Sequence, residues 1–255
     1  MGRVIAFDLD GTLAPSKSSL PPEMGILFGQ LLEKFEVCVI SGGKFEQFQT
    51  QLLDGLQVDE SLLTKLHLMP TCGTQYYRYE SGGWQQVYAE NFTPDEKEKI
   101  IYALQQGIGE LGLEEEKVYG ETIEDRGSQI TFSALGQDIV AALGDEGVRL
   151  KAEWDPTSAK KNELRDFVAN LIPEFEVRVG GGTSIDITQP GIDKAYGMQK
   201  LIDILGINKH DILFFGDRLD KDGNDYPVKQ FGIFSQQVTG WEDTAKKLGQ
   251  LLERV

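Results

Sequence analysis

The sequence has few cysteines and no long apolar run. Its 255 residues include two cysteines, Cys38 and Cys72, and no CxxC pair, which argues against a disulfide framework and a cysteine zinc site. No segment reaches the roughly 18 uninterrupted apolar residues of a membrane span. The apolar run near the amino terminus is short and ends in aspartates, unlike a signal peptide. We therefore expect a protein of the reducing cytoplasm that does not enter a membrane.

Basic charge is also scarce. Lysine and arginine number 25 against 41 aspartates and glutamates, so the formal net charge is −16. A chain this acidic has no general affinity for nucleic acid or an anionic membrane, and an anionic substrate requires a locally positive pocket. The length allows one large domain or two smaller ones, each with its own core.

Short apolar runs alternate with helical patterns at both ends of the chain. The runs 4–7, 36–40 and 212–215 predict buried strands, and 20–35, 44–56 and 193–205 have helical spacing. A strand–helix alternation with short connections is typical of a parallel α/β sheet. We therefore predict a Rossmann-like core that both chain ends form together.

The middle of the chain has a different pattern. A hairpin is expected over 75–89, a helix from Thr93 to about Leu111, and further strands around 128–135, 175–179 and 183–188. Such a segment predicts a small α+β unit with an antiparallel sheet. The expected domains are an α/β core of residues 1–74 and 191–255 and an inserted α+β cap of residues 75–190.

Acidic and polar residues follow three of the predicted core strands. Asp8 and Asp10 follow the first, Ser41 follows the second, and Asp217 follows the last apolar run. Ligands of open α/β sheets bind at the carboxyl ends of the strands, so these residues are expected to meet at one edge. Clustered carboxylates without a nearby histidine favour Mg²⁺.

The order of these motifs resembles the haloacid dehalogenase superfamily of phosphotransferases. The resemblance rests on DLDGTL at 8–13, VISGG at 39–43, Lys194 in GIDKAYG, and GDRLDKDGND at 216–225. The first and last aspartates, Asp8 and Asp217, lie 209 positions apart, which leaves room for an inserted cap. The resemblance implies a Mg²⁺-dependent enzyme.

The resemblance also implies a role for each motif residue. Asp8 is the expected nucleophile, and Asp10 is the general acid and base, whose backbone carbonyl also binds the metal. Ser41 is expected to hold the phosphoryl group with Gly42 and Gly43, and Lys194 to balance its charge. The expected metal ligands are Asp8, Asp10, Asp217, Asp222, Asn224 and Asp225.

Within the superfamily, the sequence is similar to the eukaryotic phosphomannomutases. The last motif, GDRLDKDGNDYP, has their long spacing, and stretches at 123–136 and 181–196 are also similar. This resemblance implies that Lys17, Arg126, Ser184 and Asp186 contact a sugar phosphate, and it suggests a homodimer through the cap. For Ser184 and Asp186, a water-facing sheet surface is the alternative.

Some positions depart from the mutase pattern. Gln137 stands where the mutases have an arginine, no basic residue stands near Gly144, and Lys17 replaces another arginine. A lysine cannot form the two-pronged contact of an arginine, so a second phosphate on the sugar is expected to bind weakly. This favours a phosphohydrolase that acts on a small phosphorylated sugar.

Two other functions stay open at this point. A phosphohexomutase would interconvert hexose 1- and 6-phosphates. A phospho-accepting receiver or binding module would keep the phosphate on Asp8, although such modules are about half this size and lack a cap. A cofactor other than Mg²⁺ is not expected.

Overall fold

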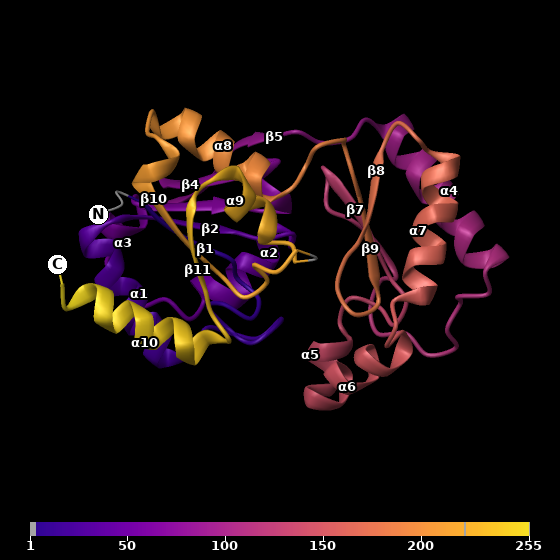
Figure 1. Ribbon diagram of the computed structural model, residues 1–255, viewed down its shortest axis with the longest axis horizontal. Helices are drawn as coiled ribbons and strands as arrows, with labels where there is room; N and C mark the ends of the chain where they lie inside the picture. Colours follow the sequence, from indigo (N-terminus) through magenta and orange to yellow (C-terminus); the bar gives the residue numbers. More distant parts are fainter. Residues whose placement is uncertain (1–3, 222, 255) are drawn as a thin grey trace. The chain divides into compact units, whose positions relative to one another are not determined.

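The structure is a computed structural model that describes residues 4–221 and 223–254, and it contains two compact units. One unit combines the residues up to Ala89 with those from Ile192 onward, and the other is Glu90–Gly191 (Figure 1). The predicted fold class, an α/β core with an α+β insert, is confirmed. Among the described residues, no helix is both long enough and apolar enough to cross a membrane.

The core unit contains a seven-stranded sheet with the strand order β11-β10-β1-β2-β3-β4-β5. The strands from β11 to β3 in this order pair in parallel, and β4 and β5 are added antiparallel. In chain order, the strands are β1 (Val4–Phe7), β2 (Glu36–Ile40), β3 (Leu66–Met69), β4 (Gln75–Glu80), β5 (Gly83–Ala89), β10 (Ile212–Gly216) and β11 (Phe234–Gln237).

Helices cover both faces of this sheet. Successive residues of a strand point to opposite faces, so Ile5 and Phe7 of β1 join one apolar cluster while Val4 and Ala6 join another. The first cluster includes residues of α1 (Pro22–Lys34) and α10 (Trp241–Leu252), and the second includes residues of α8 (Lys194–Leu205) and α9 (Tyr226–Phe231). In Figure 1, α1 and α10 lie below the strands and α8 lies above them. Strands buried on both faces leave their ends as the place for polar groups.

Long and short helices connect the core strands. Pro22 lies in the first turn of α1 and marks its start. Asp193 precedes α8, and its side chain accepts from Tyr196 N at 3.0 Å. The short elements are α2 (Phe45–Phe48), the π-helix η1 (Gln49–Leu53), α3 (Glu60–Leu63), and the 3₁₀ helices η2 (Thr71–Gly73) and η3 (Lys209–Asp211).

The hairpin at 75–89 belongs to the core sheet, although the sequence places it at the start of the cap. Strand β4 pairs with β3, with His67 opposite Arg78 and Leu68 opposite Tyr77. Tyr77 also stacks on Phe45 with ring centroids 4.0 Å apart. These contacts extend the sheet, so the second unit begins at Glu90 rather than at residue 75.

The unit Glu90–Gly191 has a four-stranded antiparallel sheet in the order β6-β7-β9-β8. Apolar residues of one face, among them Ile130, Ile185 and Ile187, share a cluster with residues of the two long helices α4 and α7. The capping box of Thr93 and Glu96 begins α4. The elements are α4 (Pro94–Glu110), β6 (Ile123–Asp125), β7 (Gln129–Ser133), α5 (Ile139–Leu143), α6 (Asp145–Trp154), α7 (Ala159–Leu171), β8 (Glu176–Val179) and β9 (Ser184–Thr188).

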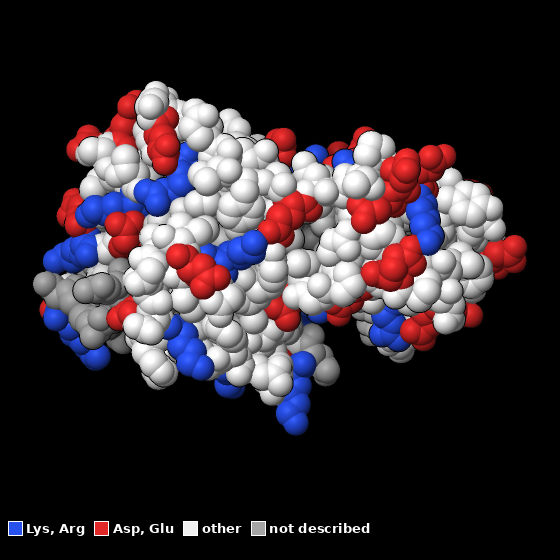
Figure 2. Space-filling model, turned by 90° about the horizontal axis from the view of Figure 1, so that it is seen from above, with Lys and Arg blue, Asp and Glu red and all other residues white. Residues whose placement is uncertain are grey.

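The surface carries charges of both signs. On the face that Figure 2 shows, acidic and basic side chains are interspersed, and the described residues form no continuous basic stripe there. This agrees with the excess of acidic residues in the composition.

Candidate active site

The carboxyl ends of neighbouring parallel strands bring the motif residues to one edge of the core sheet. Asp8 directly follows β1, Ser41 follows β2, and Asp217 follows β10. Asp8 also extends the strand pairing, because its backbone N donates to the carbonyl of Phe215 at 3.0 Å. The backbone at Asp8 is therefore fixed by the sheet itself.

Three carboxylates gather at this edge. One oxygen each of Asp8, Asp217 and Asp225 lies within 4.8 Å of the others, and Asp8 and Asp225 are buried. Asp10 is not part of this group, although the sequence predicts that it meets Asp8 and Asp217. Asp225, another of the expected metal ligands, is the third member, because the loop after β10 turns back until Asp225 accepts from the backbone N of Arg218 at 3.1 Å.

Lys194 lies between two of the carboxylates. Its Nζ donates to Asp8 Oδ1 at 2.5 Å and to Asp225 Oδ1 at 2.6 Å, and all three side chains are almost fully buried. Lys194 is the first residue of α8, so the helix start delivers its side chain to the strand ends. The other oxygen of Asp8, Oδ2, accepts from the Thr12 hydroxyl at 3.4 Å.

Burial dominates the electrostatics of this cluster. It raises the pKa of Asp8 to about 8, Lys194 acts against this rise, and Asp225 adds to it. Burial also raises the pKa of Asp217, and Asp225 raises it further. Burial alone acts to lower the pKa of Lys194, but the carboxylates of Asp225 and Asp8 outweigh it and hold the ammonium charged. When all three carboxyl groups are ionised, the single ammonium leaves two negative charges unbalanced.

Two glycines allow the acidic loops to pack this closely. Gly11 has φ +77°, and a Cβ there would lie 2.7 Å from Asp217 Oδ2. A Cβ on Gly216 would collide with Asp225 Oδ2. The glycines of both motifs therefore allow the carboxylates to approach this closely, in addition to forming the turns.

A strained loop supports the segment Ser41–Gly43. The buried Ser41 hydroxyl accepts from Gly43 N at 3.2 Å, and the carbonyls of Ser41 and Gly43 accept from Cys72 N at 2.9 Å and Thr71 N at 3.0 Å. Thr71 and Cys72 have φ of 49° and 57°, a left-handed backbone that non-glycine residues rarely adopt. Strain of this kind is held in place by surrounding contacts and is concentrated at functional sites.

The side chains that hold Asp10 are two glutamines that sequence reasoning did not identify. Asp10 Oδ1 accepts from Lys17 N at 2.6 Å and from Gln51 Nε2 at 3.1 Å, and its Oδ2 accepts from Gln47 Nε2 at 2.8 Å. Gln47 and Gln51 lie four positions apart where α2 continues into η1, so they share one helix face. This spacing directly after the SGG motif is the signal that could have identified them.

The whole arrangement agrees with the family comparison. Residues 5–227 match the model of the haloacid dehalogenase-like hydrolases, which is most of the chain. The chain belongs to the haloacid dehalogenase-like hydrolases. It is therefore an enzyme of that family. Asp8, Lys194 and the loop after β10 all lie within the matched residues.

Curated relatives of this hydrolase include phosphomannomutases. The phosphomannomutase of Oryza sativa subsp. indica is 27% identical over 257 residues, covering 98% of this chain and 96% of the relative. The phosphomannomutase of Schizosaccharomyces pombe is 26% identical over 250 residues, covering 97% and 93%. The similarity spans nearly the full length on both sides.

Solved structures share the fold at lower identity. A Plasmodium falciparum IMP-nucleotidase mutant bound to IMP has a TM-score of 0.69 at 16% identity, covering 99% of this chain and 67% of that one. A haloacid dehalogenase-like hydrolase from Bacteroides thetaiotaomicron has a TM-score of 0.65 at 14% identity, covering 98% and 100%. These likenesses show the fold alone.

The carboxylate cluster of this hydrolase fits a divalent cation. Its donors are carboxylate oxygens, the hard ligands that Mg²⁺ prefers, and the two unbalanced negative charges equal the charge of such an ion. Haloacid dehalogenase-like hydrolases typically depend on a metal. Among the other expected ligands, Asn224 is exposed, and Asp222 lies outside the described residues.

The expected sugar-binding residues of the cap unit lie on or beside its polar sheet face. Arg126 Nε donates to the buried Glu124 at 2.7 Å, and its Nη2 donates to Gln137 at 3.3 Å. Asp186 Oδ1 accepts from Thr131 at 2.7 Å and from Gln129 at 3.1 Å. Ser184 lies opposite Ser133 in the register of β7 and β9. This face is rich in hydroxyl and carboxylate groups.

Proposed function

We propose that this hydrolase is a Mg²⁺-dependent phosphohydrolase that removes phosphate from a small sugar through an aspartyl-phosphate on Asp8. The observation that supports this most is the buried Asp8 carboxylate, which directly follows β1, lies beside Asp217 and Asp225 and pairs with Lys194. Burial raises the pKa of Asp8 to about 8, and Lys194 opposes this rise, so the neighbouring ammonium increases the ionised fraction that can act as a nucleophile.

The proposed reaction has two steps. A carboxylate oxygen of Asp8 attacks phosphorus while the bond from phosphorus to the sugar oxygen breaks, and Asp10 gives its proton to that oxygen. Water then attacks the phosphorus of the aspartyl-phosphate and gives a proton to Asp10, which releases phosphate and restores both carboxyl groups. A bound Mg²⁺ supplies charge neutralisation for the phosphoryl oxygens.

Other residues around Asp8 would bind the phosphoryl group, balance its charge and hold the metal. The Ser41 hydroxyl is suited to donate to a phosphoryl oxygen, because Gly43 N donates to its oxygen and fixes its orientation, and we propose that Gly42 and Gly43 line the same phosphoryl group. Lys194 offsets the charge that two anions would bring together. Asp217 and Asp225 are the carboxylates that would hold the metal with Asp8, and the Asp10 backbone carbonyl is a further candidate ligand.

The polar face of the cap sheet supports a sugar as the substrate. We propose that the Ser184 hydroxyl hydrogen-bonds sugar hydroxyls, that the Asp186 carboxylate accepts from them, and that Lys17 and Arg126 contact polar groups of the sugar phosphate. Hydroxyls and a carboxylate in fixed positions suit a ligand with many hydroxyl groups.

The arginines of the cap sheet favour hydrolysis over mutase activity. A mutase must hold a second phosphate, but Arg126 is paired with Glu124 at 2.7 Å and Arg178 with Glu176 at 2.6 Å. Gln137 contacts Arg126 rather than adding a positive charge. Because the described arginines of this sheet are already balanced by carboxylates, a second dianion gains little from them.

A phosphohexomutase is the second candidate, because the curated relatives are phosphomannomutases. Incubation with hexose 1- and 6-phosphates and Mg²⁺ separates the two functions. We expect free phosphate from one or more sugars, with little isomer formed. Interconversion of the two phosphates that depends on a hexose bisphosphate, without net phosphate release, would instead support the mutase.

A further inference from the structure

Two glutamine side chains, Gln47 and Gln51, donate hydrogen bonds to Asp10 and are hydrogen-bonded to each other. Gln47 Nε2 donates to Asp10 Oδ2 at 2.8 Å and to Gln51 Oε1 at 2.6 Å. Gln51 Nε2 donates to Asp10 Oδ1 at 3.1 Å and to the carbonyl of Ser18 at 3.1 Å. Each amide therefore uses both of its N–H groups, and each carboxylate oxygen of Asp10 receives one of them.

Gln47 also lies against the other side of the site. A Cβ added to Gly43 would collide with Gln47 Oε1, so the amide occupies the space that a side chain would fill there. Its nitrogen end reaches Asp10 and its oxygen end reaches the segment Ser41–Gly43. Gln47 thus spans the distance between the proposed acid and the proposed phosphoryl-binding loop.

The two glutamines differ in what else they hold. Gln51 is buried, its side chain holds Ser18, and its backbone carbonyl accepts from Leu20 N at 2.6 Å, so it also fixes the loop after Asp10. The side-chain bonds of Gln47 described above end only on Asp10 and Gln51. A change at Gln47 therefore disturbs Asp10 with less effect on the loop backbone.

We propose that Gln47, with Gln51 as its support, is a positioning residue that sets the orientation of the Asp10 carboxyl for proton transfer to the leaving oxygen. This inference rests on the proposed function, in which Asp10 protonates the sugar oxygen. Two N–H donors from a helix 37 and 41 positions away restrain both oxygens of Asp10 at once. A misplacement of a catalytic group by about 1 Å can cost 10²-fold in rate.

The dependence on leaving group distinguishes positioning of an acid from general support of the fold. A sugar alkoxide is a poor leaving group and needs the proton, whereas nitrophenolate departs without one. The parameter kcat/KM covers the steps up to departure of the leaving group. Loss of the Gln47 amide should therefore lower kcat/KM for a sugar phosphate and leave that for nitrophenyl phosphate nearly unchanged.

The test compares Gln47→Met with Gln49→Met on both substrates. Methionine keeps the length of the side chain and removes its hydrogen bonds, and Gln49 is an exposed glutamine on the same helical segment. We expect Gln47→Met to lower kcat/KM for the best sugar phosphate by about 10²-fold. We expect Gln49→Met to match the wild type on both substrates.

A double-mutant cycle completes the test. In an Asp10→Asn background, Gln47→Met should cause no further loss with the sugar phosphate, because the group that it positions is gone. Equal losses on both substrates, no loss on either, or a full additional loss in the Asp10→Asn background would each overturn the inference. A wild type that hydrolyses neither substrate would instead overturn the proposed function, and the inference with it.

Discussion

At the scale of single residues, Lys194 is the charge on which the buried acidic group depends. It is 1% exposed and contacts both Asp8 and Asp225, which are themselves almost completely buried. A buried ion pair adds little net stability over apolar residues, but removal of one partner leaves the other without compensation. Lys194 is therefore needed for the fold as well as for the proposed reaction.

Replacement of Lys194 by methionine should destabilise the protein strongly. We expect the free energy of unfolding at pH 7 to fall by roughly 3–5 kcal/mol, because two buried carboxylates lose their cation. Urea denaturation of the metal-free protein measures this. The matched variant Lys229→Met removes an exposed lysine and should change the value by less than about 0.5 kcal/mol. Equal effects of the two variants would contradict the account of Lys194.

The sequence could indicate the members of the carboxylate cluster but not the partners of Asp10. Asp8, Asp217 and Asp225 follow from strand-end motifs, because parallel strands bring their carboxyl ends to one edge. The bonds from Gln47 and Gln51 depend on how the segment after β2 packs against the loop after β1. The spacing of Gln47 and Gln51 places them on one helix face, but that they donate to Asp10 is a result of tertiary packing.

At the scale of elements, the contact between η2 and α8 fixes the loop beside Ser41. Gly73 has φ +86°, and a Cβ on it would collide with the Cα of Gly197 in α8. The loop and the helix start that carries Lys194 therefore touch through two residues without side chains. Any side chain at either glycine must push these elements apart.

Gly73→Ala should cost more stability than Gly82→Ala. Both glycines have nearly the same positive φ, +86° and +82°, but a Cβ on Gly82 meets open space. Alanine at Gly82 should cost about 1–2 kcal/mol from the backbone alone. Alanine at Gly73 should cost a further 1–3 kcal/mol or so from overpacking. Thermal unfolding of both variants measures the difference, and equal losses would show that the close contact is unimportant.

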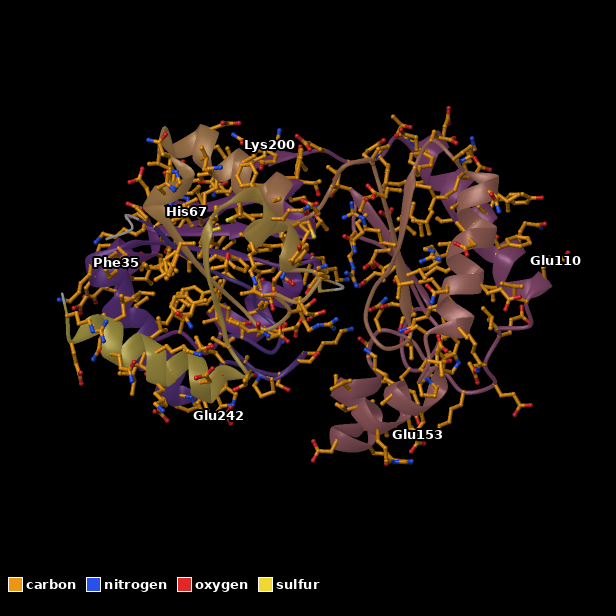
Figure 3. The ribbon with its side chains drawn as sticks, viewed as in Figure 1. Phe35, His67, Glu110, Glu153, Lys200 and Glu242 are labelled. Carbon is orange, nitrogen blue, oxygen red and sulfur yellow. The ribbon has the colours of Figure 1, made fainter. Side chains whose placement is uncertain are left out.

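The buried His67 makes the core sheet sensitive to acid. Figure 3 shows His67 among the strands, and its ring lies 2.8 Å from the Tyr76 hydroxyl and 3.0 Å from Glu36. Burial lowers the pKa of His67, Glu36 opposes this, and Arg78 adds to it. Since the folded state binds the proton on His67 less readily than the unfolded chain, the contribution of His67 to stability is full above pH 6.5 and falls as the pH drops below it.

His67→Gln should reduce the loss of stability that His67 causes at acidic pH. We expect the wild type to lose on the order of 1 kcal/mol relative to His67→Gln between pH 7.5 and about 5.5. Asp8, whose pKa is raised to about 8, also titrates near this window but is common to both proteins. The pKa of Glu36 is lowered from 4.5, so its own titration lies below this window. His210→Gln, at the chain's other and exposed histidine, should keep the wild-type loss. Chemical denaturation at several pH values tests this, and identical slopes for all three proteins would contradict it.

For the hairpin β4–β5, the sequence predicts the strands and the turn but not the sheet that they join. Its turn and strands follow from the local pattern around Ser81–Gly83, and the structure has them. The sheet that it joins follows from pairing with β3 and from the stack of Tyr77 on Phe45, which are contacts between distant segments. The change in composition near residue 75 therefore marks a new type of strand pairing and not a domain boundary.

At the scale of the whole molecule, alternation of strands and helices predicted the architecture well. Parallel strands from both chain ends form one sheet, and the middle forms a separate antiparallel unit. The full-length similarity to phosphomannomutases extends to both units, so the fold does not separate hydrolysis from transfer. The proposed function makes that choice from charges in the cap unit, where Arg126 and Arg178 are paired with carboxylates.

The covalent intermediate on Asp8 is the most direct test of the proposed function. The enzyme is mixed with Mg²⁺ and a sugar phosphate that it hydrolyses, and the reaction is quenched in acid within the first turnover. The peptides of the enzyme are then analysed by mass spectrometry. We predict a phosphoryl group on the peptide that contains Asp8, which forms and decays at rates compatible with kcat, and none in Asp8→Asn. Steady turnover by Asp8→Asn, or a phosphoryl group on another residue, would contradict the account.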